Sequence, residues 1–346
     1  MRTSVSASLS IAVAAGVVLL LGLPAHAQTG APKAASAARS ARPYSPARTP
    51  WGDPDLSGTY TNTSESGTPF ERPAEFDGKT LDQITPAELA KAIDERNKRK
   101  VERAPLLGGE SGTGAGPTHW FEDYDAKNSR PWMVTDPPDG KVPPTTDEAK
   151  QRAAILVAKR RGGDSYNTGP FDGPEDLTLY VRCISRGLPG SMMPAIYGNS
   201  YQIVQGPGFV SIRYEMVHET RIIPLDNRPR LRDDIQLDMG DARGHFEGDA
   251  LVVETTNFRE RTAFRGASSH LKLTERFKPM GPKALEWSVT SDDPHTWTRP
   301  WTFAMTLTRD DNQPVFEYAC HEGNHGLYDI LSAARAEEAA AAHVAK

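Results

Sequence analysis

The sequence has 346 residues, a formal net charge of −5 at pH 7 and 25% charged side chains. This mildly acidic balance excludes the basic surface that nucleic-acid-binding proteins need. The 28 prolines and 29 glycines favour turns and loops over long helices.

The N-terminus has the pattern of a secretory signal. Arg2 precedes the apolar run Ile11–Leu23, and Ala25-His26-Ala27 then supplies the small residues of a cleavage site. No later stretch approaches the roughly 20 apolar residues of a membrane span. We therefore expect a signal peptide over residues 1–27 and a periplasmic or secreted protein without a membrane span. Residues 28–50, rich in Ala, Ser, Arg and Pro, are expected to form a flexible linker.

Residues 51–180 lack enough periodic apolar side chains for a core of their own, which predicts an irregular, proline-rich wrapping segment. Two helices are expected within it, over about Thr85–Val101 and Thr146–Arg161, counting the threonine that caps each one. Both begin with a capping hydroxyl and an early acid, as helix N-termini do. The sequence also admits a short strand over Ser57–Thr63.

Residues 181–326 change to short strands separated by turn residues. The expected strands are Tyr201–Gln205, Phe209–Tyr214, one that ends at Ile223, Gly244–Glu247, Leu251–Thr256, Leu271–Lys278, Leu285–Ser291, Trp301–Thr308 and Val315–Cys320. Apolar residues recur at every second position in several of them, so one face of the sheet is buried. Such a meander closes to remove its exposed edges. The sequence therefore predicts a mainly β protein, an antiparallel up-and-down meander closing into a barrel, followed by a surface helix over residues 327–346.

Several blocks spread along the chain resemble a family of exported bacterial proteins to which no reaction is attached. The blocks are Trp51-Gly52-Asp53-Pro54-Asp55-Leu56-Ser57-Gly58, Phe70-Glu71-Arg72-Pro73, Met239-Gly240-Asp241-Ala242-Arg243-Gly244-His245-Phe246-Glu247-Gly248-Asp249, Thr255-Thr256-Asn257-Phe258, Asp293-Pro294-His295-Thr296-Trp297 and Glu317-Tyr318-Ala319-Cys320-His321-Glu322-Gly323-Asn324. This resemblance implies export and leaves the activity open. Gly58-Thr59-Tyr60 is also similar to the first strand of lipocalin-like barrels, which implies that the barrel is lipocalin-like.

A cluster of ionisable residues lies beside the Gly248-Asp249 turn. If this segment is a strand, Arg243, His245 and Glu247 share a face, which brings together a cation, a base and an acid. We interpret them as candidate catalytic residues, with His245 and Glu247 as the acid/base pair and Arg243 as the charge stabiliser. The alternative is an exposed strand edge, where polar residues are expected anyway.

Glu275 and His321 are further candidate catalytic residues. Glu275 is in phase with Leu273 and Phe277, so it lies on the apolar face, where a carboxylate must be paired or neutral. A carboxyl group in such a place is a candidate general acid or base. The alternative is an internal salt bridge to an arginine such as Arg221 or Arg243.

Four residues are candidates for substrate binding: Arg221, Glu215, Trp287 and Tyr318. The two charged residues lie on segments that are otherwise apolar, and the two aromatic residues have the character of a cavity lining. The alternatives are a solvated ion pair on the outer face, which contributes about 0–1 kcal/mol, and ordinary core packing.

His321-Glu322-Gly323-Asn324-His325 contains the H-E-x-x-H signature of zinc proteases, which needs a helix to place both histidines on one face. The Gly-Asn pair between the histidines disfavours a helix. A second arrangement, in which His218, His245, Glu247 and His321 converge in a barrel, would suit zinc, iron or manganese. We adopt neither arrangement and expect no metal site and no cofactor.

The sequence has two cysteines, Cys183 and Cys320. In an oxidising compartment they can form a disulfide, and otherwise they are two buried thiols. Both interpretations remain open.

The leading functional hypothesis is a periplasmic or secreted enzyme that acts by acid/base catalysis on a small organic or saccharide-like substrate, as a lyase, isomerase or hydrolase. The alternative is a lipocalin-like carrier or sensor of a small apolar ligand, without catalysis. Convergence of Arg243, His245, Glu275 and His321 in a pocket would favour the enzyme, and an apolar interior would favour the carrier. A filled barrel without a pocket would instead indicate a structural envelope protein. The sequence does not predict the oligomeric state.

Overall fold

The computed structural model describes residues 44–103, 127–159, 171–195, 197–260 and 264–344. These residues belong to one compact unit, which spans Pro43–Lys346. The expected signal peptide, residues 1–27, and most of the expected linker lie outside the described residues. The part of the linker that is described packs on the barrel, because Arg48 forms an ion pair with Asp249 at 2.6 Å.

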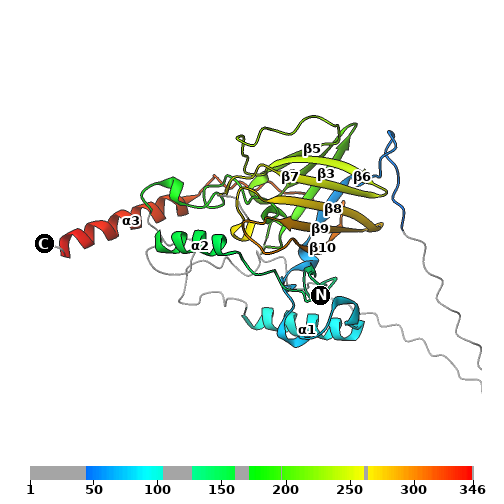
Figure 1. Ribbon diagram of the computed structural model, residues 1–346, viewed down its shortest axis with the longest axis horizontal. Helices are drawn as coiled ribbons and strands as arrows, with labels where there is room; N and C mark the ends of the chain where they lie inside the picture. Colours follow the sequence, from blue (N-terminus) through cyan, green and yellow to red (C-terminus); the bar gives the residue numbers. More distant parts are fainter. Residues whose placement is uncertain (1–43, 104–126, 160–170, 196, 261–263, 345–346) are drawn as a thin grey trace, which may run out of the picture. The chain divides into compact units, whose positions relative to one another are not determined.

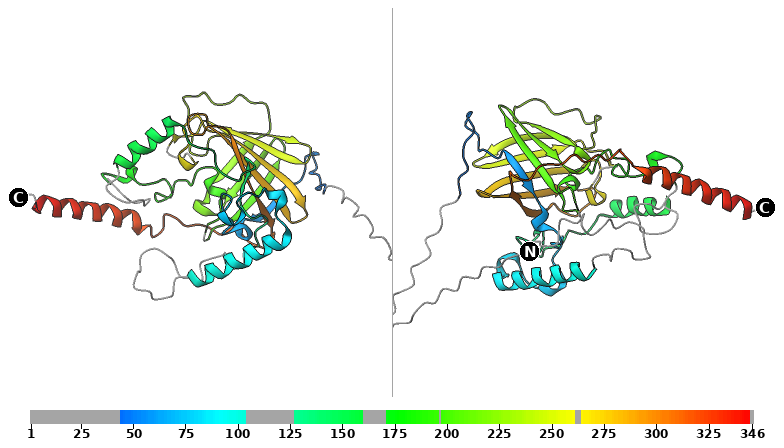
Figure 2. Two further views of the ribbon diagram at one scale, coloured as in Figure 1. Left: turned by 60° about the horizontal axis from the view of Figure 1, so that its bottom comes forward. Right: turned by 180° about the vertical axis from the view of Figure 1, so that it is seen from behind.

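The described chain forms a nearly closed antiparallel barrel, which confirms the predicted fold class (Figures 1 and 2). Its strands are β1 (Gly58–Thr61), β3 (Ser200–Gly206), β4 (Phe209–Tyr214), β5 (Thr220–Pro224), β6 (Asp241–Glu247), β7 (Ala250–Thr256), β8 (Lys272–Gly281), β9 (Ala284–Asp292) and β10 (Trp301–Arg309). A short strand outside the barrel order, β2 (Val134–Asp136), pairs with β10. The order around the barrel is β5-β4-β3-β1-β10-β9-β8-β7-β6.

The barrel nearly closes where β5 meets β6, the two ends of the strand order. Gly244 of β6 lies so close to this seam that a Cβ there would be 2.7 Å from Ile223 and 2.8 Å from Leu225. Glycine is therefore favoured at this position, because a side chain would force these neighbouring side chains to shift.

We call β8, β9 and β10 the far wall of the barrel, and along these strands buried side chains alternate with less buried ones. In β8, Leu273, Glu275 and Phe277 are buried, and the residues between them are only partly buried. β9 and β10 repeat this pattern with large apolar side chains at every second position. Since successive side chains of a strand point to opposite faces, one face of these strands fills the barrel.

One predicted strand is absent and another takes its place. Residues Val315–Cys320 were expected to form the ninth strand, and the structure shows them as an irregular segment that is partly or fully exposed. The edge of β10 is instead occupied by β1, which pairs with β10 through Tyr60 and Arg309 and with β3 through Tyr60 and Tyr201. The short strand that the sequence allowed over Ser57–Thr63 is β1, which is an integral part of the barrel wall.

Three helices lie outside the barrel, where the sequence predicted them: α1 (Pro86–Arg103), α2 (Asp147–Lys159) and α3 (His325–Val344). The N-terminus of α1 is capped reciprocally, since Thr85 N donates to the Glu88 carboxylate at 2.9 Å and Glu88 N donates to Thr85 Oγ1 at 3.3 Å. None of the described helices is both long and apolar enough to cross a membrane.

Candidate functional site

The register of the strands arranges the barrel interior in layers. Glu275 of β8 pairs with Val253 of β7 and with Val289 of β9, and Val289 pairs with Phe303 of β10. Residues in register share a face, so these four side chains form one layer of the interior. All four are fully enclosed, with 0% exposure.

Glu275 forms an ion pair across this interior with Arg221 of the opposite wall. The guanidinium donates two hydrogen bonds to the carboxylate, at 2.5 Å from Nη1 to Oε2 and at 3.1 Å from Nη2 to Oε1. Trp287 Nε1 donates a third, at 3.1 Å, to Oε1. The pair is therefore bidentate and enclosed, which is the geometry in which an arginine and a carboxylate interact most strongly.

Arg221 reaches the interior because the chain turns sharply between β4 and β5. Val217 and His218 have φ values of +61° and +48°, and the turn they form resets the phase of the strand. Arg221 then pairs in register with Ile212, and both side chains face the interior. Positive φ at a β-branched residue such as valine is strained, so the surrounding packing must hold this turn in place.

Tyr214 lies beside Arg221. We call Arg221, Tyr214, Glu275 and Trp287 the polar centre of the barrel. Burial raises the pKa of the Tyr214 hydroxyl, although the neighbouring Arg221 lowers it, and the net change is upward. For Arg221, burial lowers the pKa, but the charge and the hydrogen bond of Glu275 raise it by more, so the net change is again upward. At neutral pH the centre therefore contains a neutral phenol and a charged guanidinium.

A second interior layer contains polar side chains without partners. Thr255, Leu273, Ser291 and Trp301 are in register on four adjacent strands, two residues from the layer of Glu275. Thr255 Oγ1, Ser291 Oγ and Trp301 Nε1 have no hydrogen-bond partner among the described residues, and all three side chains are 0% exposed. Buried polar groups are nearly always hydrogen-bonded, so this layer has unused capacity for hydrogen bonds.

Aromatic side chains cover this layer at the adjacent end of the barrel. We call Phe70, Phe264 and Trp297 the aromatic cap. The rings of the cap lie 5.7, 6.3 and 5.2 Å, in that order, from the ring of Trp301, measured between centroids. The Arg265 guanidinium lies 4.4 Å from the centre of the Phe70 ring. An apolar cap over unpaired polar groups gives this end of the interior an amphipathic character.

The opposite end of the barrel is filled by the chain that precedes β1. Leu56 is buried, and its backbone N–H donates to Gln205 Oε1 at 2.5 Å. Gln205 in turn donates to the Pro54 carbonyl at 3.0 Å, and Tyr60 donates to the Leu56 carbonyl at 2.9 Å. The Trp51–Gly58 block of the sequence thus closes one end of the barrel.

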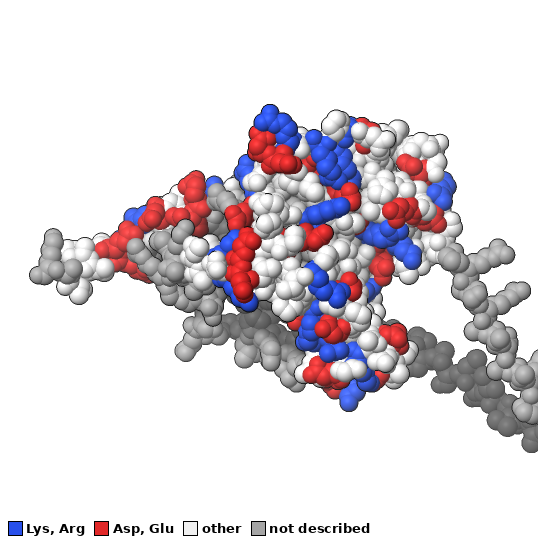
Figure 3. All heavy atoms as spheres, in the orientation of Figure 1, with Lys and Arg blue, Asp and Glu red and all other residues white. Residues whose placement is uncertain are grey.

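The candidate catalytic residues of β6 lie on the outer face. Ala242, Gly244 and Phe246 pair with the interior residues of β7, so Arg243, His245 and Glu247 point outward. His245 and Glu247 are more than half exposed and lie 3.2 Å apart, and Glu247 accepts a hydrogen bond from Arg276 at 2.6 Å. On the face drawn in Figure 3, basic and acidic side chains are interspersed rather than gathered in a patch of one sign. The inward convergence that would favour an enzyme is not found among these residues.

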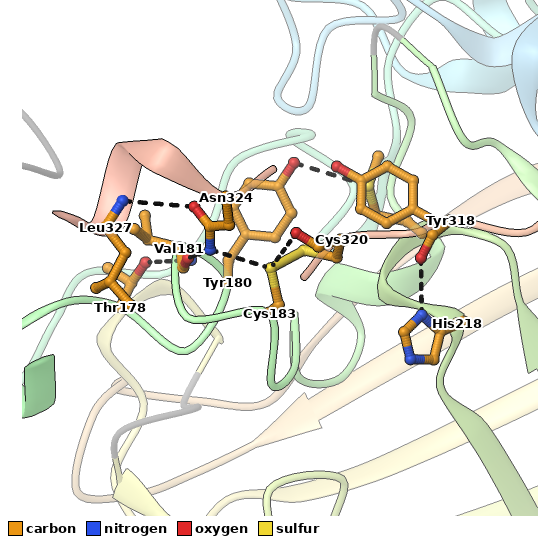
Figure 4. The surroundings of a disulfide bond; sticks show 10 residues. Thr178, Tyr180, Val181, Cys183, His218, Tyr318, Cys320, Asn324 and Leu327 are labelled. Carbon is orange, nitrogen blue, oxygen red and sulfur yellow. Dashed lines mark hydrogen bonds between the residues drawn. A yellow bond between two sulfur atoms is a disulfide. The ribbon is translucent and has the colours of Figure 1, made fainter. Parts of the chain in front are cut away.

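A disulfide holds the segment that contains Tyr318 outside the barrel strands (Figure 4). His321 follows the bridged Cys320 directly in the sequence. Cys183 and Cys320 are joined, with their Cα atoms 5.6 Å apart. Asn324 Nδ2 donates to the Val181 carbonyl at 3.0 Å, next to the bridge. The Glu317–Asn324 block of the sequence therefore anchors the segment between β10 and α3.

Tyr318 packs against tyrosines, not against the interior ion pair. Its pKa is raised by burial and by hydrogen bonds with Tyr197 and Tyr180. Its carbonyl lies 2.8 Å from His218 Nδ1. Glu215, the remaining candidate for substrate binding, is buried at the end of β4 and accepts a hydrogen bond from Ser200 N at 3.2 Å. Of the four candidates for substrate binding, Arg221 and Trp287 reach the polar centre.

Among the described residues, no group of three or more His, Cys, Asp or Glu side chains is arranged to hold a metal ion. His325 is the first residue of α3 and His321 precedes the helix, so the H-E-x-x-H sequence is not on a helix. The rings of His218 and His321 lie 6.5 Å apart between centroids.

A surface hollow of about 340 Å³ lies away from the barrel interior, at the start of α1. Its lining is mostly apolar and consists of Leu81, Ile84, Thr85, Pro86, Leu89, Ser129, Arg130 and Pro131. Arg130, the one charged residue of this lining, forms an ion pair with Glu286 at 2.8 Å. The hollow therefore brings together no acid/base groups.

Sequence reasoning missed Thr255, Ser291 and the unpaired nitrogen of Trp301. A signal for two of them was present, because Thr255 is in phase with Val253 and Ser291 is in phase with Val289. A hydroxyl that continues an apolar face indicates a polar group inside the barrel.

The fold and site together define a β-barrel protein with a polar centre and an amphipathic interior layer. No family model matches the chain, and no curated protein matches it. Among solved structures it is similar to a secretary abundant heat soluble (SAHS) protein from Ramazzottius varieornatus, with 11% sequence identity and a TM-score of 0.23. The match covers 33% of this chain and 74% of that one.

Proposed function

We propose that this protein is an exported small-molecule-binding protein, a carrier or sensor whose barrel holds a small, largely apolar ligand without catalysis. The observation that carries the proposal is the layer of Thr255, Ser291 and Trp301, whose polar atoms are enclosed and unpaired. An unpaired buried polar group costs about 1–3 kcal/mol, and a bound ligand that supplies the missing partners removes that cost.

The aromatic cap supports the proposal, because it offers apolar contacts beside the unpaired groups. Binding sites for small molecules are typically apolar with a few polar groups that fix orientation. The disulfide is consistent with an oxidising compartment, as export to the periplasm or secretion requires. The sequence blocks that resemble those of exported bacterial proteins agree with this location.

The arrangement of charged side chains favours binding over acid/base catalysis. Both oxygens of Glu275 accept hydrogen bonds, which leaves this carboxylate engaged with Arg221 and Trp287. The other candidate catalytic residues, Arg243, His245, Glu247 and His321, are not beside it. A general base must reach the proton that it abstracts, and this arrangement brings no second acid/base group to Glu275.

The proposal is tested by titrating the purified protein with N-phenyl-1-naphthylamine, an uncharged aromatic dye, and following dye fluorescence and tryptophan fluorescence. We expect saturable binding in the barrel, accompanied by a change in tryptophan emission, because Trp301 lies in the proposed site. Octanol should displace the dye. An absence of saturable binding of both dye and octanol would overturn the proposal.

The variant Thr255→Val separates a binding role from a structural role. It removes an unpaired hydroxyl with little change of shape, so the ligand-free protein should become more stable by about 1 kcal/mol. Ligands that bond to this hydroxyl should bind about tenfold more weakly. Thr274→Val, on the outer face of the neighbouring strand β8, is the matched control and should change neither property. Equal behaviour of the two variants would contradict the assignment of the site to this layer.

A further inference from the structure

The Arg221–Glu275 ion pair lies enclosed in the centre of the barrel. We infer that the Arg221–Glu275 pair makes the interior selective for uncharged, hydrogen-bonding amphiphiles and excludes both carboxylates and ammonium ions. This inference rests on the proposed function and adds to it the chemical class of the ligand.

Arg221 would by itself attract an anionic head group. A guanidinium enclosed in a barrel binds carboxylates by two parallel hydrogen bonds. Here that geometry is already used by Glu275, whose two oxygens accept from Nη1 and Nη2 of Arg221. The two charges cancel, so a second carboxylate would enter the interior without a free cation to compensate it.

Glu275 is also held in place, so a ligand does not readily displace it. It lies in β8, its side chain is 0% exposed, and Trp287 of β9 donates to one of its oxygens. An ammonium ligand would face the same problem in reverse, because the carboxylate is already paired with Arg221. Both kinds of charged ligand would therefore be desolvated without gaining a partner.

Arg221 Nε also lacks a partner, but the charge of its guanidinium is compensated by Glu275. The other unpaired interior groups, including the Tyr214 hydroxyl, are uncharged. Thr255 and Ser291 each offer a hydroxyl, and Trp301 offers an indole N–H. These groups suit a ligand hydroxyl, ether, ester or amide, while Phe70 and Phe264 of the aromatic cap contact its apolar part.

The inference is tested with three ligands that share one chain and differ in charge: octanol, octanoate and octylamine. Their affinities for the wild-type protein are measured by calorimetry and by displacement of N-phenyl-1-naphthylamine at neutral pH, where the acid and the amine are ionised. Octanol should bind at least about tenfold more tightly than either charged ligand. If octanoate or octylamine binds as tightly as octanol, the inference fails and the proposed function stands. If none of the ligands and no dye binds, both fail.

Two single substitutions should shift the preference in opposite directions. Glu275→Gln keeps an acceptor for Trp287 but leaves Arg221 uncompensated, so octanoate should gain about tenfold relative to octanol. Arg221→Met leaves the carboxylate uncompensated, so octylamine should gain by a similar factor. A residue with a purely structural role would not produce this reversal.

Glu286→Gln is the matched control, because Glu286 lies on the outer face of β9 next to Trp287. It should leave all three affinities unchanged. Circular dichroism and cooperative unfolding establish that each variant is folded. A folded Glu275→Gln variant that keeps the wild-type preference would overturn the inference. If neither single variant folds, the wild-type comparison of the three ligands decides.

Discussion

Two neighbouring residues of β8, Glu275 and Arg276, show how differently the two faces of the barrel wall use an ion pair. Glu275 points inward and is bonded to Arg221 in full enclosure. Arg276 points outward and donates to the exposed Glu247 at 2.6 Å. The chemistry is the same, but water screens the outer pair and does not reach the inner one. Of these two ion pairs, only the inner one can therefore contribute much to folding stability or select the charge of a ligand.

The largest expected effect is that of Glu275→Ala, which should lower the free energy of unfolding by about 3–5 kcal/mol because it leaves Arg221 buried without a partner. Urea denaturation followed by tryptophan fluorescence measures the change. The double replacement Arg221→Met with Glu275→Leu removes both charges and should restore most of the stability. A loss below about 1 kcal/mol in the single variant would show that the inner pair behaves like a surface pair.

A smaller effect is expected at the seam of the barrel. Gly244→Ala would place a methyl group 2.7 Å from Ile223 and should lower stability by about 1–3 kcal/mol through overpacking. His245→Ala, one residue further along the strand and on the outer face, is its control and should have almost no effect. Equal stability of the two variants would contradict the close approach of β5 and β6 at Gly244.

The smallest effect is expected for Glu247→Ala, whose midpoint of thermal unfolding at physiological salt should be indistinguishable from that of the wild type. The pKa of Glu247 is lowered, first by Arg276 and then by His245. Because the folded protein favours the ionised form, this weak stabilisation is present at neutral pH and disappears as the pH falls through the carboxyl range. It should also fade with added salt. A large loss of stability at neutral pH would contradict the contrast between the two faces.

The sequence predicted the far wall of the barrel well and β6 poorly, for one physical reason. In β8, β9 and β10 large apolar side chains mark the inner face, so Glu275 could be placed inside from its phase alone. In β6 the inner positions include Ala242 and Gly244, which are too small to mark a face. The orientation of His245 therefore depends on the register with β7, which the β6 sequence alone does not predict.

The partner of Glu275 and the order of the strands depend on contacts between distant parts of the chain. Arg221 lies 54 residues before Glu275, and it faces inward because positive φ at Val217 and His218 resets the phase of the strand. No local sequence pattern predicts such a turn. Likewise, the alternation in Val315–Cys320 resembles a strand, but β1 already occupies the edge of β10.

The position of β1 also has a consequence for how the chain folds. Strands β3–β5 and β6–β10 are two separate meanders, and β1 joins them in the strand order by pairing with β3 on one side and β10 on the other. Tyr60 finds its partner Arg309 only after nearly the whole chain has been made, so the closing contact spans a very long loop. Contacts of this kind slow folding and leave strand edges exposed during synthesis. Removal of the residues before Ser200 would thus cut a strand out of the barrel wall and yield two open sheets prone to aggregation.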